Sequence, residues 1–233
     1  LLNIYFYDEN NKKTILKENI TVHKGTIIDT SFLSIKELYK FFEQQLKNCI
    51  DEKILLSLHL KASMMKVSDP IIFGHMLKVY FKNFISNNKK ILSDLNANFN
   101  SGLSILYEKI DSLEKDEKNR IIKEMEDVFL SSAEIAMVDS EKNISNFHVP
   151  SDLIIDASMP AMIKSSGKMW NRNGELKDTK AIIPDSTYAS IYQATIDFCK
   201  QKGAFDPSTM GTVQNVGLMA KKAEEYGSHD KTF

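Results

Sequence analysis

The sequence contains few cysteines and almost no net charge. Its 233 residues include only two cysteines, Cys49 and Cys199, which lie far apart and match no metal-ligand spacing. We therefore expect two thiols in a reducing compartment rather than a disulfide. A formal net charge of −1 provides no basic surface for nucleic acid or for an anionic membrane. These features argue against a disulfide-stabilised secreted domain and against a nucleic-acid-binding protein.

Signals for membrane insertion or export are also missing. No apolar stretch approaches the roughly 18 residues that a spanning helix needs. The first residues, LLNIYFYDENNKK, lack the basic start and the small-residue cleavage site of a signal peptide. We therefore expect a cytoplasmic protein. The chain begins with Leu1 rather than methionine, which indicates a segment or a processed product of a longer chain.

Common catalytic motifs are absent as well. The sequence has no glycine-rich phosphate loop, no nucleophile elbow and no H-x-x-x-H pair, so residues that hold a nucleotide would have to lie elsewhere. His59 alternates with Leu58 and Leu60, a pattern that favours a hydrogen-bonded interior histidine over a metal ligand. Hydrophobic residues make up 42% and charged residues 26% of the chain, which is ordinary for a globular protein with a sizeable core.

The hydrophobic pattern predicts strands that alternate with helices. Helix 34–49 starts with the capping box Ser34-x-x-Glu37, and a second helix over 69–85 starts with Asp69 and Pro70. The other expected elements are strands over 3–7, 14–22, 54–60, 134–139 and 152–158, a helical region over 93–130 broken near 96–102, a turn at Asn173-Gly174, and helices over 186–204 and 218–226. This order predicts an α/β fold, in which the apolar run 54–60 is a buried strand of a parallel sheet flanked by helices.

Polar residues follow two of the predicted buried strands. KASMMKVSDP follows the first, with Lys61, Lys66, Ser68 and Asp69, and DASMPAMIKSSGKMW follows the second, with Asp156, Ser158 and Lys168. In open α/β sheets, ligands bind beyond the carboxyl ends of the strands. These two places are therefore candidates for a site.

Each candidate has a structural and a functional interpretation. Asp156 fits a helix N-cap, which is the commoner role at such a position, and it also fits a ligand of Mg²⁺. Lys61 is either an ordinary surface lysine or a buried lysine that exchanges a proton. Near the end of the sequence, EEYGSHDKTF places Tyr226 either in a polar loop after a helix or in the role of a proton donor. Composition and periodicity leave these alternatives open.

Long stretches of the sequence resemble the monomeric NADP-dependent isocitrate dehydrogenases. The resemblance is carried by LSLHLKASMMKVSDPIIFGH, VPSDLIIDASMPAMIKSSGKMW, DTKAIIPDSTYASIYQ, GAFDPSTMG and NVGLMAKKAEEYGSHDKTF. It runs from about Ser34 to Phe233, and the strands before Ser34 fit it too. Because the family's chains are much longer, the resemblance implies that residues 1–233 are an internal segment of the larger of two domains, with no complete second domain.

The resemblance also implies a reaction. Isocitrate would be oxidised and decarboxylated to 2-oxoglutarate, with NADP as hydride acceptor and Mg²⁺ or Mn²⁺ as Lewis acid. Lys61 matches an acid/base residue, Asp156 a metal ligand, and Tyr226 the residue that protonates the enolate. The residues that hold NADP and clamp the substrate carboxylates would lie outside this sequence, so the segment alone is expected to be inactive and its parent chain monomeric. The alternatives are a noncatalytic α/β ligand-binding module and a metal-dependent lyase on the same scaffold.

Overall fold

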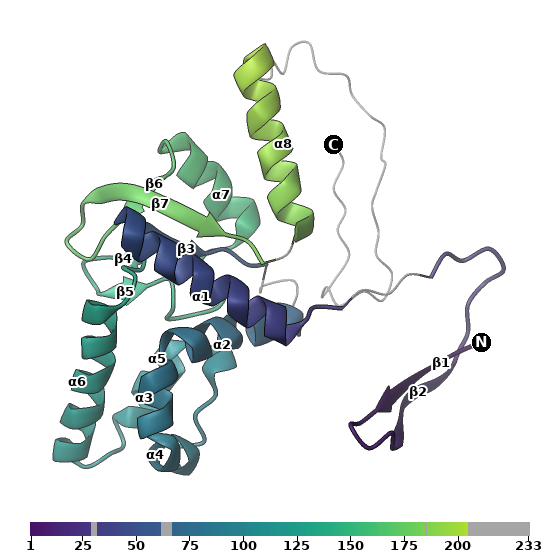
Figure 1. Ribbon diagram of the computed structural model, residues 1–233, viewed down its shortest axis with the longest axis horizontal. Helices are drawn as coiled ribbons and strands as arrows, with labels where there is room; N and C mark the ends of the chain where they lie inside the picture. Colours follow the sequence, from purple (N-terminus) through teal and green to yellow (C-terminus); the bar gives the residue numbers. More distant parts are fainter. Residues whose placement is uncertain (29–31, 62–66, 185, 205–233) are drawn as a thin grey trace. The chain divides into compact units, whose positions relative to one another are not determined.

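The computed structural model describes residues 1–28, 32–61, 67–184 and 186–204, with residues 156, 157 and 186–188 described through their backbone only (Figure 1). The chain divides into two units, the first ending at Ser34 and the second beginning at Ile35. The first unit contains an antiparallel hairpin of β1 (Leu2–Tyr7) and β2 (Lys13–Ile20). This confirms the two strands expected over 3–7 and 14–22.

The second unit is an α/β structure. Its helices are α1 (Ile35–Glu52), α2 (Ser68–Tyr80), α3 (Lys82–Asn87), α4 (Lys89–Asp94), α5 (Leu103–Ile110), α6 (Lys115–Ser131), α7 (Ile155–Lys164) and α8 (Ser186–Lys202), with a 3-10 turn η1 (Phe99–Ser101). Its strands are β3 (Leu55–Leu58), β4 (Met137–Asp139), β5 (Ile144–Ser145), β6 (Lys168–Trp170) and β7 (Leu176–Ile182). The predicted α/β fold with flanking helices is confirmed.

The sheet is mixed rather than parallel. Its strands lie in the order β3-β7-β6-β4-β5, and of these neighbours only β3 and β7 run parallel. The reason is the turn at Asn173-Gly174, where Gly174 has a φ of +76° and the chain folds back so that β6 and β7 form an antiparallel hairpin. The sequence signal for this turn was correct, and the expectation of a parallel sheet holds only for the β3–β7 pair.

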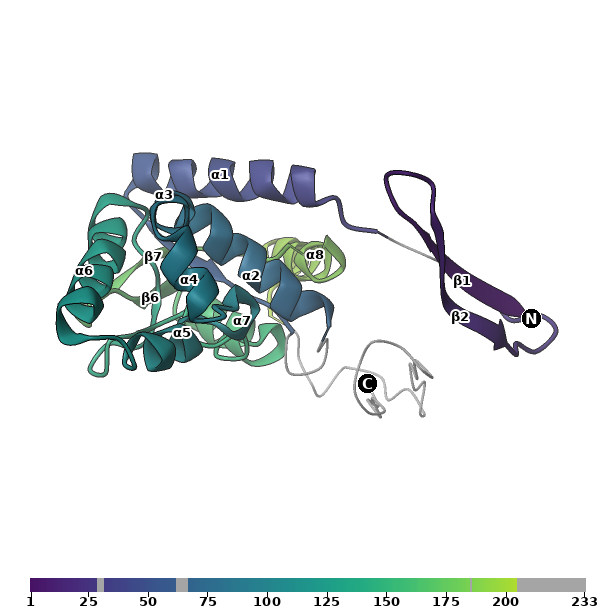
Figure 2. The same ribbon diagram turned by 90° about the horizontal axis from the view of Figure 1, so that it is seen from below.

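Strand β3 is buried on both faces, as its apolar sequence predicts. Leu56 and Leu58 join the larger hydrophobic cluster, which includes buried residues of α1, α2, α5 and α6. Leu55 points the other way and packs with Ile155, Met159 and other residues of α7. Because side chains alternate along a strand, Ser57 and His59 lie on the α7 face as well. Figure 1 shows α2–α6 on one side of this sheet and α7 and α8 on the other, and Figure 2 shows α1 lying along one side of the unit.

Helix α1 begins directly after Ser34, where the capping box predicts. Its residues Leu38 and Phe42 are buried, and Phe41 and Leu46 are half-buried against the same cluster. Cys49 is a buried free thiol on this helix, and Cys199 on α8 is a half-buried one. The expectation of thiols rather than a disulfide is therefore confirmed.

Candidate functional site

The candidate site lies where β3 ends beside the start of α7. One side of β3 pairs with β7, and among the described residues the opposite side has no continuous partner strand. Instead, the backbone of Leu56 bonds to Glu134 and Ala136, with N–O distances of 2.8 and 2.9 Å. Further along, the Leu60 amide donates to the Leu153 carbonyl at 3.3 Å, and the Ile155 amide donates to the Leu60 carbonyl at 2.9 Å. The end of β3 is thus held against residues 153–155.

This pairing brings Lys61 and Asp156 to the same edge. Leu60 and Ile154 form an isolated parallel bridge, so Lys61 follows one partner directly and Asp156 lies two residues after the other. Of the two strand-like segments that the sequence predicts before these positions, the first forms β3 and the second forms only the bridge at Ile154. The Lys61 residue is only 6% exposed, so its interpretation as an ordinary surface lysine is wrong. A buried lysine must be compensated by its surroundings, which is typical of functional sites.

The backbone of Lys61 is fixed by a buried carboxylate. The Lys61 amide donates to Oδ2 of Asp69 at 2.6 Å, and Asp69 is 5% exposed. The sequence predicts a helix that starts with Asp69, but α2 begins one residue earlier, at Ser68, and Asp69 lies within its first turn. Its carboxylate joins the start of α2 to Lys61, three residues after the end of β3.

Asp156 lies inside α7 rather than at its cap. The N-cap residue of α7 is Ile154, which is extended (φ −87°, ψ 126°) and makes no side-chain cap bond. The N-cap interpretation of Asp156 is therefore wrong, and so is the strand expected over 152–158, which is reduced to the single bridge at Ile154. The apolar run Leu153–Ile155 has strand-like composition, but α7 begins already at Ile155, and both ends of the run are buried in the cluster that contains Leu55 and Met159. Asp156 nevertheless remains in the first turn of a helix, where an anionic side chain is favoured by the helix dipole.

His59 connects the two segments. Its Nδ1 lies 2.7 Å from Oγ of Ser158 on α7, and its Nε2 lies 2.8 Å from Oγ of Ser57 on β3. The ring is fully buried, and burial lowers its pKa to about 4, so it is neutral at physiological pH. The sequence-based expectation of a hydrogen-bonded interior histidine is confirmed.

Tyr226 lies outside the described residues, as do the expected final helix over 218–226 and Lys66. Within the part of the chain that the structure describes, there is no group of three or more His, Cys, Asp or Glu side chains that could hold a metal ion. None of the helices in the described ranges is long and apolar enough to span a membrane.

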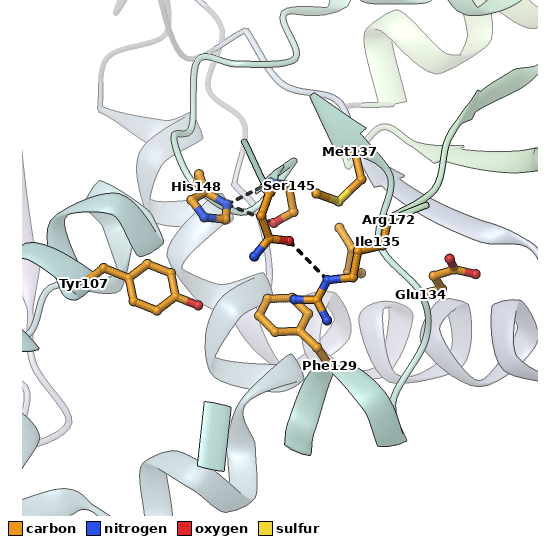
Figure 3. A pocket seen from close by; sticks show the side chains of 9 residues that line it. Tyr107, Phe129, Glu134, Ile135, Met137, Ser145, His148 and Arg172 are labelled. Atoms are coloured by element: carbon orange, nitrogen blue, oxygen red, sulfur yellow. Dashed lines mark hydrogen bonds between the residues drawn. The ribbon is translucent and has the colours of Figure 1, made fainter. Parts of the chain in front are cut away.

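A separate cavity lies between α5, α6, β4, β5 and the β6–β7 turn, and Figure 3 shows its lining. Its volume of about 40 Å³ has room for a few water molecules, well below the several hundred Å³ typical of ligand sites. The Arg172 guanidinium lies over the Phe129 ring and is bound by both carboxylate oxygens of Glu126. Because this cation is already paired and the space is small, the cavity does not fit a tricarboxylate substrate.

Among the polar residues that the sequence indicates after the two strand-like segments, Lys61 and Asp69 are in direct contact, and Asp156 and Ser158 lie in one helix. The sequence patterns do not indicate Asn146, whose side chain bonds to the backbone of Leu58. No local signal distinguishes a buried asparagine of this kind from a loop asparagine.

Comparison with known proteins identifies close relatives. The model of the family described as monomeric isocitrate dehydrogenase matches residues 1–233. The isocitrate dehydrogenase (NADP) 2 of Mycobacterium tuberculosis is 50% identical over 225 residues, which are 97% of this chain and 30% of that protein. Isocitrate dehydrogenase (NADP) 2 of Colwellia maris is 49% identical over all of this chain and 31% of its own length, and the Azotobacter vinelandii enzyme is 48% identical over 97% and 30%. The chain thus spans about a third of the length of the curated relatives that it matches.

Proposed function

The chain belongs to the monomeric isocitrate dehydrogenase family, and we propose that it forms part of an NADP-dependent enzyme that converts isocitrate to 2-oxoglutarate and CO₂. The relatives named above are NADP isocitrate dehydrogenases at about half identity across nearly the whole chain. The observation that carries the assignment of the site is the bridge between Leu60 and Ile154, which brings the backbone of Asp156 to the same edge of the sheet as the buried Lys61.

Asp156 is proposed as a ligand of the divalent metal. Mg²⁺ and Mn²⁺ take oxygen ligands, and Mg²⁺ sites often use only one or two carboxylates, with water and substrate oxygens completing the shell. Asp156 in the first turn of α7 fits such a donor, and further carboxylates would come from the part of the protein beyond this chain. When bound, the metal would supply a Lewis acid that stabilises negative charge on the substrate oxygens.

Lys61 and Tyr226 are proposed as the groups that move protons. Lys61 would take the proton of the substrate hydroxyl as hydride leaves for NADP⁺, and Tyr226 would later protonate the enolate that remains after CO₂ departs. Loss of the proton and the hydride makes the ketone, loss of CO₂ makes the enolate, and one proton completes 2-oxoglutarate. The backbone bond from Lys61 to Asp69 fixes the point from which the lysine side chain extends.

The remaining machinery would lie outside this chain. The NADP contacts and the clamp for the substrate carboxylates are proposed for the other two thirds of the protein, which would be a cytoplasmic monomer. The isolated 233-residue chain is accordingly expected to form no NADPH from isocitrate.

The direct test uses the full-length protein that contains this chain. Purified protein is incubated with isocitrate and NADP⁺, with Mg²⁺ or with a chelator, and NADPH and 2-oxoglutarate are measured. Metal-dependent formation of both products in equal amounts supports the proposal. A protein that binds isocitrate without turning it over would instead support the noncatalytic alternative.

A further inference from the structure

Three side chains form a continuous chain of hydrogen bonds between β3 and α7. The Ser57 hydroxyl lies 2.8 Å from Nε2 of His59, and the His59 Nδ1 lies 2.7 Å from the Ser158 hydroxyl. The Ser158 hydroxyl in turn donates to the Ile154 carbonyl at 2.8 Å. The set joins a residue of β3 to the first turn of α7, two elements far apart in the sequence (Figure 1).

The hydrogen atoms in this chain have one consistent arrangement. A serine hydroxyl has a single hydrogen, and that of Ser158 is used on the Ile154 carbonyl. Ser158 must therefore accept the bond from His59, so Nδ1 of His59 carries the ring hydrogen. Nε2 is then the acceptor for the Ser57 hydroxyl. The imidazole is thereby fixed on both sides.

The position of these hydrogen bonds is unusual for bonds with a structural role alone. Ser57 is fully buried in β3, whose other three residues are leucines, and His59 is fully buried directly after its last residue, so apolar residues would have filled the space without a need for partners. His59 comes two residues before Lys61, and Ser158 comes two residues after Asp156. The hydrogen bonds of Ser57, His59 and Ser158 therefore connect the segments that carry the two candidate site residues.

We propose that His59 is a positioning residue, which acts through Ser158 to hold the first turn of α7, and with it Asp156, against the end of β3 that carries Lys61. This inference rests on the proposed function, because it requires that Asp156 binds the metal. Removal of a residue that orients a metal ligand without contacting the metal commonly lowers metal affinity by about 10- to 100-fold.

The experiment compares two substitutions of His59 in the full-length protein. Asn places an amide nitrogen near the position of Nδ1, so His59→Asn keeps the bond to Ser158 and loses the bond to Ser57. Gln reaches the position of Nε2, so His59→Gln keeps the bond to Ser57 and loses the bond to Ser158. If His59 only filled space, the smaller Asn would be the more harmful of the two.

The readout is binding of Mn²⁺ alone, followed by the electron paramagnetic resonance signal of the free ion. We expect His59→Gln and Ser158→Ala to raise the Kd for Mn²⁺ about tenfold or more. His59→Asn should stay within about threefold of wild type. The double variant His59→Gln/Ser158→Ala should be no weaker than Ser158→Ala alone, because both remove the same bond. His75→Gln, on α2 beside Tyr39, controls for loss of a histidine elsewhere.

Thermal unfolding of every variant establishes that it is folded at the assay temperature. Equal Mn²⁺ affinity in folded His59→Gln, Ser158→Ala and wild-type protein would overturn the inference. So would a larger loss in His59→Asn than in His59→Gln. Failure of the proposed function is seen separately, since wild-type protein would then form no NADPH from isocitrate whatever the variants bind.

Discussion

The side chain of Asn146 takes the place of a partner strand for Leu58. The Leu58 amide donates to Oδ1 of Asn146 at 2.5 Å, and Nδ2 of Asn146 donates to the Leu58 carbonyl at 2.9 Å. Both residues are 1% exposed. These two bonds lie between the backbone bonds of Leu56 and those of Leu60. The segment from Leu56 to Leu60 is therefore hydrogen-bonded along this side.

Substitution of Asn146 should therefore destabilise the fold. Asn146→Ala leaves a buried backbone donor and acceptor without partners, at an expected cost of about 2–4 kcal/mol in the free energy of unfolding. Urea unfolding of the full-length protein measures the change. Asn83→Ala, at an exposed position of α3, is the control and should change stability by less than about 0.5 kcal/mol. Equal effects of the two substitutions would show that the Asn146 bonds contribute nothing.

Gly102 is expected to tolerate no side chain. Its φ is +83°, and a Cβ atom there would lie 2.1 Å from the His148 carbonyl oxygen, which is fixed backbone. Gly167 has a similar φ of +77° and nothing within 4 Å of such an atom. Gly167→Ala should thus cost about 1 kcal/mol for backbone strain alone, and Gly102→Ala should cost at least about 2 kcal/mol more. Thermal unfolding of the two variants compares the crowded position with the open one, and equal shifts would contradict the crowding.

The buried His59 predicts a loss of stability in weak acid. Its pKa is about 4 in the folded protein and about 6.5 when unfolded, so the unfolded state takes up a proton first as the pH falls. The free energy of unfolding is therefore unaffected by protonation of His59 above about pH 6.5. It decreases between pH 6.5 and 4, and the decrease has reached about 2 kcal/mol at pH 5. Urea unfolding at pH 7 and pH 5, in the presence of a chelator, measures this decrease.

The control for this titration is His59→Asn. The variant lacks the imidazole, and its stability should fall about 2 kcal/mol less between pH 7 and pH 5 than that of the wild type. His75 and His148 also have lowered pKa values because of burial, and they contribute equally to both proteins. Identical pH dependence in the two proteins would contradict a depressed pKa at His59.

Local patterns predicted those elements whose signals are complete within a few residues. The capping box at Ser34 gave the start of α1, the leucine-rich run gave β3, and Asn173-Gly174 gave the β6–β7 hairpin. The start of α7 was misjudged, because Leu153–Ile155 is equally suited to a strand or to a buried helix end. Asn146 could not be predicted, since its role depends on Leu58, 88 residues away. Likewise, Lys61 could be recognised as a strand-end residue, but its burial depends on packing that no local pattern encodes.

Lys61 and Tyr226 should be essential for turnover rather than for folding. Removing a general acid or base typically lowers rates by about 100- to 10,000-fold, which we expect in kcat for Lys61→Met and for Tyr226→Phe in the full-length protein. The substrate KM should change much less, because binding is assigned mainly to other residues. Lys36→Met, at an exposed position of α1, is the matched control and should retain the wild-type kcat.

The central claim is that Asp156 and Lys61 belong to one metal-dependent site for isocitrate oxidation. Its most direct test is the rate of isocitrate-dependent NADPH formation by the full-length protein as a function of Mn²⁺ concentration, for wild type, Asp156→Asn and Asp152→Asn. Asp152 lies four residues away on the other side of the Leu60–Ile154 bridge and controls for loss of a nearby carboxylate. We predict that Asp156→Asn requires at least about tenfold more Mn²⁺ for half-maximal rate, or is inactive at all concentrations, while Asp152→Asn follows the wild-type curve. A wild-type Mn²⁺ dependence and rate in Asp156→Asn would contradict the claim.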